Sequence, residues 1–263
     1  MLRLGSDPFV EGLRHTDPVA LLVALAVTAA TTACGARRWS LLAARLRVEV
    51  PFRDAYAACY RAQLLNATLP FGVVGDVHRG YRHGRDSGAL ARGLGSVAWE
   101  RASGQLVQVG LAAAALPLLV GGTWVLALPV AAVLLGAAVV SRGGVWPQVV
   151  LLSAAASCGH VAVLVVAART AGVTAPTYQL VALGLLVLVA SAVPLSVAGW
   201  GPREGAAAWL FGAAGLGAAT GLEVSVVYGV MSLVATLPGI LVLRGDTRTA
   251  RGGTAWASGP TSS

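Results

Sequence analysis

The sequence predicts an all-α, polytopic membrane protein: a helical bundle with about seven crossings and one re-entrant half-helix. Hydrophobic residues make up 56% of the 263 residues and charged residues 11%, against about 45–50% and about 25% in a soluble domain. Several apolar runs approach or reach the roughly 20 residues that a helix needs to cross a bilayer. The basic residues stand in short segments between these runs. These observations exclude a soluble globular domain.

The first predicted span runs from about Pro18 to Ala36. It ends at a basic cluster with a tryptophan, Arg37, Arg38 and Trp39, which is typical of the cytoplasmic interface. The segment RRWSLLAARLRVEVPFR, residues 37–53, is basic and amphipathic. This pattern predicts a helix that lies along the inner membrane surface.

The next stretch, from about Asp54 to Pro70, is only moderately apolar and contains Arg61, Gln63 and Asn66. Lipid would leave these polar groups without hydrogen bonds. We therefore predict a half-span buried among other helices, or lining a wet cavity, that enters and returns on the cytoplasmic side.

Later apolar runs complete the predicted bundle, which occupies residues 18–243. They are Gly104–Val120, Trp124–Val140, Trp146–Ala168, Tyr178–Ala198, the shorter Ala206–Ala218, and Glu223–Leu243. We expect residues 1–17 to form an outer, amphipathic segment and residues 244–263 a disordered cytoplasmic tail. With this topology only Arg3, Arg14 and Arg169 lie outside, which satisfies the positive-inside rule. The prediction is a multi-pass protein of the cell membrane with a cytoplasmic C-terminus.

The net charge of +8 and pI near 10.4 come from arginine alone, because the chain contains no lysine. These arginines fit the loop positions of a membrane protein, so no nucleic-acid partner is expected. Three cysteines, Cys34, Cys59 and Cys158, lack metal-binding or redox spacing and are interpreted as free thiols. No P-loop, nucleophile elbow, dinucleotide fingerprint or HExxH motif is present, so the sequence gives no catalytic module and no cofactor site.

The stretch NATLPFGVVGDVHRGYRHGR, residues 66–85, concentrates polar and helix-breaking residues between apolar segments. Pro70 ends the half-helix, and Gly72 and Gly75 permit turns and close approaches. Asp76 and Arg79 follow, and a guanidinium held by a carboxylate suits a phosphate or headgroup site. Two alternatives are a plain cytoplasmic loop and a metal site, whose ligands would be Asp76, His78 and His83.

A second polar stretch, SVAWERASGQLVQ (96–108), carries Glu100 and Arg101. On a helix, Arg101, Gly104, Gln105 and Gln108 share one face. This stripe predicts a cavity lining, with a structural ion pair as the alternative.

The third stretch, SAVPLSVAGWGPREGAAAWLFGAAG (191–215), breaks two apolar segments before Arg203 and Glu204. Paired breaks of this kind indicate a transporter-type site near the membrane midplane. A tight turn with a surface ion pair is the alternative. His160 shares a helical face with Ser153 and Ser157. A neutral, hydrogen-bonded imidazole is the preferred interpretation there, and a proton relay the other.

These three stretches together resemble, in the same order, the polar signatures of the lysylphosphatidylglycerol synthase transmembrane-region family. The segments are RAQLLNATLPFGVVGDVHRGYRHG, VAWERASGQLVQ and PLSVAGWGPREGAAAWLFGAAGL. The resemblance implies a helical, flippase-like domain with re-entrant segments that moves or presents lipids or lipid-linked sugars. Its implied signature residues are Asn66, Pro70, Gly72, Gly75, Asp76 and Arg79, then Glu100 and Arg101, then Pro194, Ser196, Gly199, Gly201, Arg203 and Glu204. Members commonly begin with a further span, of which MLRLGSDPF resembles the outer end.

From these residues we expect a cavity for an anionic headgroup or lipid phosphate, without metal or cofactor. Arg79, Arg101 and Arg203 would bind phosphate, while Asp76, Glu100 and Glu204 would orient them, and Gln105 would extend the polar wall. The expected partner is a phospholipid or a polyprenyl-phosphate-linked lipid. One alternative is a membrane subunit that presents lipid to a separate transferase, and another is a structural scaffold. Lysyl transfer by this chain is not expected, because the sequence has no counterpart of the aminoacyl-transferring domain.

Overall fold

The computed structural model describes residues 17–119, 136, 143–192 and 201–241. These residues form eight α-helices and one 3₁₀ turn, with no strand among them, so the predicted all-α class is confirmed. The helices are α2 (Pro18–Arg45), α3 (Phe52–Thr68), α4 (Val74–Asp86), α5 (Leu90–Ala115), α7 (Trp146–Thr170), α8 (Thr177–Ser191), α9 (Pro202–Ala213) and α10 (Ala218–Thr236); the 3₁₀ turn is η1 (Leu116–Leu118).

Three helices of the described part are long and apolar enough to cross a membrane: Pro18–Arg45, Trp146–Thr170 and Ala218–Leu241. The apolar helix α8 is shorter. Apart from residue 136, the predicted run Trp124–Val140 lies outside the described residues, as does the end of Tyr178–Ala198. The predicted total of about seven crossings is therefore not established by this part of the chain.

Helix α2 corrects one prediction. It continues without a break through residues 37–45, where a separate surface helix over 37–53 was expected. The reason is burial: Trp39 is 1% exposed, and the Arg38 guanidinium pairs with Glu100 of α5. Within this basic cluster Arg38 and Trp39 contact α5, whereas Arg37 is exposed. After a short extended link, α3 begins at Phe52.

Helix α5 also differs from the prediction at its start. It begins at Leu90, so the polar stretch 96–108 lies inside a helix of 26 residues rather than at the beginning of a span. At 1.5 Å per residue this helix is about 39 Å long. Glu100 and Arg101 therefore lie inside the bundle, about four helical turns before the C-terminal end of α5.

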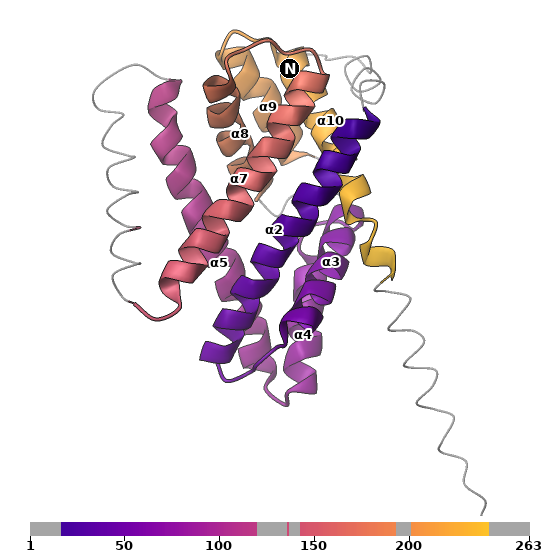
Figure 1. Cartoon of the computed structure of the whole chain (residues 1–263), viewed down its shortest axis with the longest axis vertical. Coiled ribbons are helices and arrows are strands. Elements are labelled where there is room, and N and C mark those ends of the chain that lie inside the picture. Colours follow the sequence, from indigo (N-terminus) through magenta and orange to yellow (C-terminus); the bar gives the residue numbers. More distant parts are fainter. Residues whose placement is uncertain (1–16, 120–135, 137–142, 193–200, 242–263) are drawn as a thin grey trace, which may run out of the picture.

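Helices α3 and α4 form a hairpin against α2 and α5, in the lower half of Figure 1. The turn follows Leu69, whose extended backbone precedes Pro70, and both Phe71 and Gly72 adopt positive φ. This is the chain reversal that the proline and glycines predicted. Its depth in a bilayer stays a prediction.

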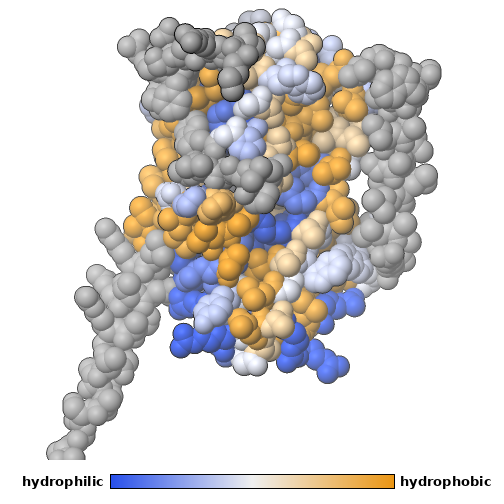
Figure 2. Space-filling view, turned by 180° about the vertical axis from the view of Figure 1, so that it is seen from behind, coloured by the Kyte–Doolittle hydropathy of each residue, from blue (hydrophilic) through white to orange (hydrophobic). Residues whose placement is uncertain are grey.

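Packing divides the bundle into two regions. A large apolar core joins α8, α9, α10 and the upper parts of α2, α5 and α7, around fully buried residues such as Leu164, Leu183 and Met231. A smaller core surrounds Trp39 at the α3 end of the bundle. In the space-filling view, hydrophilic residues show at mid-height within a mostly hydrophobic face and gather again at the lower end (Figure 2). The mid-height polar groups are the subject of the next section.

One glycine controls the approach of α4 to α3. A Cβ added at Gly75 would clash with the backbone of Ala62, including its carbonyl oxygen. Backbone cannot move aside as a flexible side chain does. We expect Gly75→Ala to lower the free energy of unfolding in detergent by about 1–3 kcal/mol through overpacking. Gly205→Ala on α9 is the control, because its Cβ would meet open space. Equal stability of the two variants would contradict the close packing of α3 on α4.

Candidate functional site

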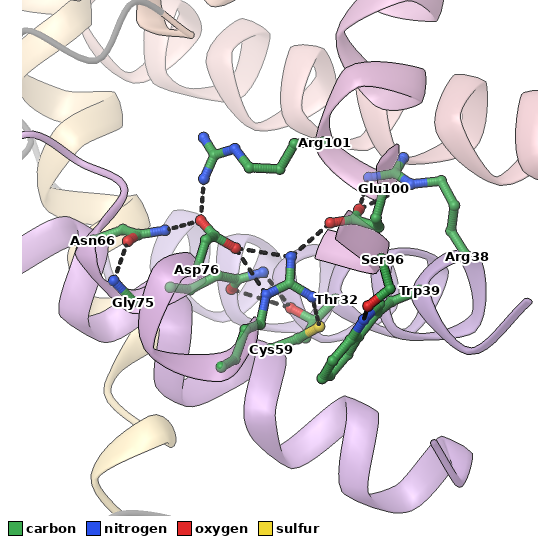
Figure 3. A network of polar contacts seen from close by, with 12 residues as sticks. Thr32, Arg38, Trp39, Cys59, Asn66, Gly75, Asp76, Ser96, Glu100 and Arg101 are labelled. Carbon is green, nitrogen blue, oxygen red and sulfur yellow. Dashed lines mark hydrogen bonds and ion pairs between the residues drawn. The ribbon is translucent and has the colours of Figure 1, made fainter. Parts of the chain in front are cut away.

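A cavity of about 270 Å³ lies between α2, α3, α4, α5 and α7. Polar and charged side chains dominate its lining, although α2 and α7 are apolar enough to span a membrane. Polar groups inside a membrane domain usually mark a substrate pathway or relay. The cavity is therefore the candidate site, and Figure 3 shows the network of contacts along its wall.

Arg79 of α4 is at the centre of this network. Its Nε donates to Asp76 Oδ1 at 2.8 Å, and its Nη2 donates to Glu100 Oε2 at 2.6 Å. Its Nη1 lies 3.4 Å from Cys59 Sγ. Because Arg79 is 4% exposed and Asp76 and Glu100 are 7% and 4% exposed, these charges neutralise one another with little help from water. One guanidinium thus ties α3, α4 and α5 together.

Asp76 is held from a second side by α3 and α5. Its Oδ2 accepts from Asn66 Nδ2 at 2.5 Å and from Arg101 Nη1. The Oδ1 of Asn66 in turn accepts the backbone N–H of Gly75 at 2.8 Å. Asn66 therefore fixes both the start of α4 and its first carboxylate (Figure 3).

Glu100 is held by α2 as well as by α4. The Nε of Arg38 donates to Glu100 Oε1 at 2.9 Å, and its Nη2 pairs with the same oxygen. The Nη1 of Arg38 donates to Ser153 Oγ of α7 at 2.9 Å. Arg38 consequently joins three helices, and a carboxylate held between two guanidiniums is well neutralised.

Trp39 closes the network on the α4 side. The Arg79 guanidinium lies over its ring at 4.8 Å, and its Nε1 donates to Ser96 Oγ at 2.9 Å. Its indole also meets the edge of the His83 ring at 5.5 Å. The ring thus packs Arg79 from the face that the carboxylates leave uncovered.

A second cavity, of about 290 Å³, is also lined in part by this network. Trp39, Arg61, Arg79, Arg82 and His83 contribute to its lining, together with acidic residues at its rim. Arg79 is therefore part of the walls of both cavities. The two cavities therefore meet the same ion-paired side chain.

The third polar stretch forms a separate contact group between α9 and α10. Arg203 Nη2 pairs with Glu204 Oε1 at 2.6 Å, Arg203 Nε donates to Ser225 Oγ at 3.1 Å, and the guanidinium lies over Tyr228. Glu204 Oε2 accepts the N–H of Gly201, whose φ is +130°. In the described part of the chain, the residues that line the central cavity do not include Arg203 or Glu204.

The predicted site residues lie in three different places in the structure. The structure brings together at the cavity Asn66, Asp76, Arg79, Glu100, Arg101 and Gln105. Pro70 and Gly72 lie in the turn and Gly75 at the α3 contact. Gly201, Arg203 and Glu204 form their own group on α9, and Pro194, Ser196 and Gly199 lie outside the described residues. The second broken segment was predicted to share a phosphate site with the first, but its described residues Gly201, Arg203 and Glu204 do not line the central cavity.

The metal alternative finds no support in the geometry. Asp76 is engaged by Arg79, Arg101 and Asn66, and His83 Nε2 lies 2.8 Å from the carbonyl of Val48. Within the described residues no group of three His, Cys, Asp or Glu side chains could hold a metal ion.

Sequence reasoning missed Arg38 and Ser153 as members of the site. A signal was present in the first apolar helix: Thr31, Gly35 and Arg38 repeat at helical spacing and line the cavity together. Ser153, Ser157 and His160 of α7 were predicted to share a face, and all three line the same cavity.

A family model described as lysylphosphatidylglycerol synthase TM region matches residues 1–143 and 139–239. The chain belongs to this family. No curated protein and no solved structure matches the chain. Membership of the lysylphosphatidylglycerol synthase TM-region family, together with the apolar helices, places the protein in a membrane and is consistent with a lipid-related role.

The ion network predicts strong energetic coupling in this family member. We expect Arg79→Gln and Glu100→Gln each to lower the free energy of unfolding by about 3–5 kcal/mol, because each removes one charge from a buried set whose members share their partners. The double variant should lose at least about 1 kcal/mol less than the sum. Unfolding in mixed micelles measures both quantities. Asp86→Asn, at an exposed 4.0 Å pair with Arg82, should change stability by less than about 1 kcal/mol. Additive losses would contradict the network.

Gly104 sets the position of Arg38. A Cβ at residue 104 would lie 2.9 Å from Arg38 Nη2, so Gly104→Ala should shift this flexible guanidinium, weaken its contact with Glu100 and destabilise the protein by about 1 kcal/mol. The loss should shrink in an Arg38→Gln background, which removes the crowded atoms. Gly95→Ala on the same helix is the control, because its Cβ would lie 4.0 Å from the Leu46 side chain. The same loss in both backgrounds would refute this role.

Proposed function

We propose that this protein binds the phosphate of an anionic membrane lipid in the central cavity and carries the lipid headgroup across the bilayer. The observation that supports this most is the charge balance of the cavity wall. Among the described residues that line the cavity, Arg38, Arg79 and Arg101 face two carboxylates, Asp76 and Glu100. The wall therefore has one formal positive charge in excess, and a phosphodiester with its single negative charge would neutralise it.

Arg101 is the best placed of the three to meet a ligand. Its side chain is 33% exposed, against 11% for Arg38 and 4% for Arg79. Only one of its terminal nitrogens is used for Asp76, and a guanidinium offers five N–H donors in a planar fork. In this proposal Arg101 and Arg38 contact the phosphate, while Arg79 keeps the two carboxylates in position. Arg203, on α9, does not take part in this contact.

The size of the cavity supports a headgroup rather than a whole lipid as occupant. Its volume of about 270 Å³ is just below the ~300 Å³ at which small-molecule pockets begin. Acyl or prenyl chains would stay in the surrounding lipid, beside exposed apolar residues such as Leu22, Leu106 and Leu151. Such a division between a polar cavity and lipid-immersed tails is what headgroup transport requires.

Translocation, rather than binding alone, is supported by the second cavity. The two cavities share Arg79 as a wall, so a headgroup that passed from one to the other would have to displace its contacts. A phosphate could do so because it offers the guanidiniums the same kind of oxygen ligands that Asp76 and Glu100 provide.

The test is lipid translocation by the purified protein in vesicles that contain fluorescent phosphatidylglycerol or polyprenyl phosphate. The wild type should expose inner-leaflet label to a membrane-impermeant quencher faster than protein-free vesicles do. Arg101→Gln should slow this by at least about tenfold, since a hydrogen bond to a charged group contributes about 1.5–3 kcal/mol. Arg85→Gln removes the same charge from an exposed position on α4 and should leave the rate unchanged.

Three results separate the alternatives. Equal rates for wild type, Arg101→Gln and empty vesicles would contradict transport. Arg101-dependent binding without translocation, together with copurification of a transferase, would favour a subunit that presents lipid. Loss of stability with unchanged lipid binding would favour a scaffold.

A further inference from the structure

Arg101 differs from the other two arginines of the cavity in how it is held. Arg38 and Arg79 each donate hydrogen bonds to at least two partners. Among the described residues, the partner of Arg101 is a single oxygen, Oδ2 of Asp76. Figure 3 shows one terminal nitrogen of Arg101 turned to Asp76 and the other turned away. Because one contact holds it and its side chain is 33% exposed, Arg101 can leave Asp76 without disturbing the rest of the network.

Asp76, by contrast, keeps its position when Arg101 moves. Its Oδ1 accepts from Arg79 Nε and lies 2.8 Å from Nη2 of the same guanidinium. Its Oδ2 accepts from Asn66 Nδ2 at 2.5 Å. Both oxygens therefore retain a donor after Arg101 has left, and the buried carboxylate avoids the cost of an unsatisfied charged group. The movable member of this ion pair is the arginine.

A lipid phosphate and the Asp76 carboxylate would compete for Arg101. Both are oxyanions that accept charge-assisted hydrogen bonds from a planar guanidinium. A phosphate that binds Arg101 must therefore offset the contact that Arg101 makes with Asp76. The apparent affinity for a ligand falls with the fraction of time in which the binding group is available. An arginine that spent nine-tenths of its time on a carboxylate would bind phosphate about tenfold more weakly than a free one.

Asn66 adjusts the strength with which Asp76 holds Arg101. The backbone N–H of Gly75 donates to Asn66 Oδ1 at 2.8 Å and so orients the amide. Its Nδ2 then donates to the same Asp76 oxygen that Arg101 uses. Gly75 packs against the backbone of Ala62, so the end of α3 and the start of α4 keep the amide in place. Because two donors share one oxygen, the contact of Arg101 with this oxygen is weaker than it would be alone.

Resting on the proposed function, we propose that Asp76 is an internal competitor of the lipid phosphate. Its carboxylate holds Arg101 until a phosphate enters the cavity, gives up the arginine to that phosphate, and takes the arginine back as the phosphate moves on. Asn66 is a positioning residue that keeps this hold weak enough for the exchange. Asp76 therefore weakens the binding of the lipid and speeds its release, whatever the rest of the headgroup.

Two measurements on the intact protein distinguish an internal competitor from a residue that only stabilises the bundle. They are the dissociation constant of dihexanoyl phosphatidylglycerol in nanodiscs and the translocation rate of fluorescent phosphatidylglycerol in vesicles. Asp76→Asn should bind the probe about tenfold more tightly, because Arg101 is then free. It should also translocate lipid several-fold more slowly than the wild type, because affinity changes lie mostly in the dissociation rate. A purely structural carboxylate would give weaker binding and slower translocation together.

A second set of variants tests whether Asp76 acts through Arg101. In an Arg101→Gln background, Asp76→Asn should change the dissociation constant by less than about twofold, because no arginine remains to be released. Asn66→Leu should weaken binding of the probe about threefold to tenfold, the value of one hydrogen bond, and should lose this effect in the Asp76→Asn background. Thr68→Val is the matched control on the same helix end. Its hydroxyl donates to the Leu64 carbonyl and lies outside the cavity lining, so binding should stay unchanged.

The outcomes separate this inference from the proposed function. If Asp76→Asn bound the probe no more tightly than the wild type, or translocated it as fast, the competitor role would be overturned, although phosphate binding at Arg101 could still stand. A gain in affinity that persisted without Arg101 would reflect only the lost negative charge of the wall and would overturn the role as well. If binding of the probe did not depend on Arg101 at all, the proposed function itself would fail.

Discussion

The structure depends on a buried guanidinium that no single carboxylate satisfies. Arg79 needs Asp76 on its own helix and Glu100 on α5, and Trp39 covers its face. Each carboxylate then has a second arginine, Arg101 or Arg38. An unpaired charge among membrane helices costs about 2.5–3.5 kcal/mol or more. The five charges therefore hold α2, α4 and α5 in one arrangement, and the cavity is the space that this arrangement leaves open.

The sequence alone predicted those features that are determined by residues close to one another in the chain. Apolar runs identified the helical class, and the start of α7 at Trp146 was found directly. Pro70 and Gly72 located the reversal between α3 and α4. Helical spacing placed Arg101, Gln105 and Gln108 on one face, and that face does line the cavity. In each case the pattern and the cause lie within a few residues of one another.

Features that depend on partners distant in the chain could not be predicted from the sequence in this way. Arg38 and Trp39 have the composition of an interfacial cluster, and only Glu100 and Ser96, some sixty positions away, make them interior residues. The same holds for the length of α2, which continues through Arg38 and Trp39 because these two side chains pack against α5. Arg203 and Glu204 carry the same residue types as the first site, yet Ser225 and Tyr228 of α10 are their partners. Residue type alone does not reveal which charges converge.

The sharing of Glu100 between Arg38 and Arg79 has an evolutionary consequence. A change of charge at any of these positions unbalances the buried set, so drift in the ionic cluster is expected to occur through compensated pairs of substitutions. Gln105, Gln108 and Ser157 of the cavity wall are uncharged and lie outside the ionic cluster, so each of these positions can vary without a compensating substitution. Substitutions among paralogues should therefore accumulate at these uncharged positions of the cavity wall, while the ionic cluster stays nearly invariant.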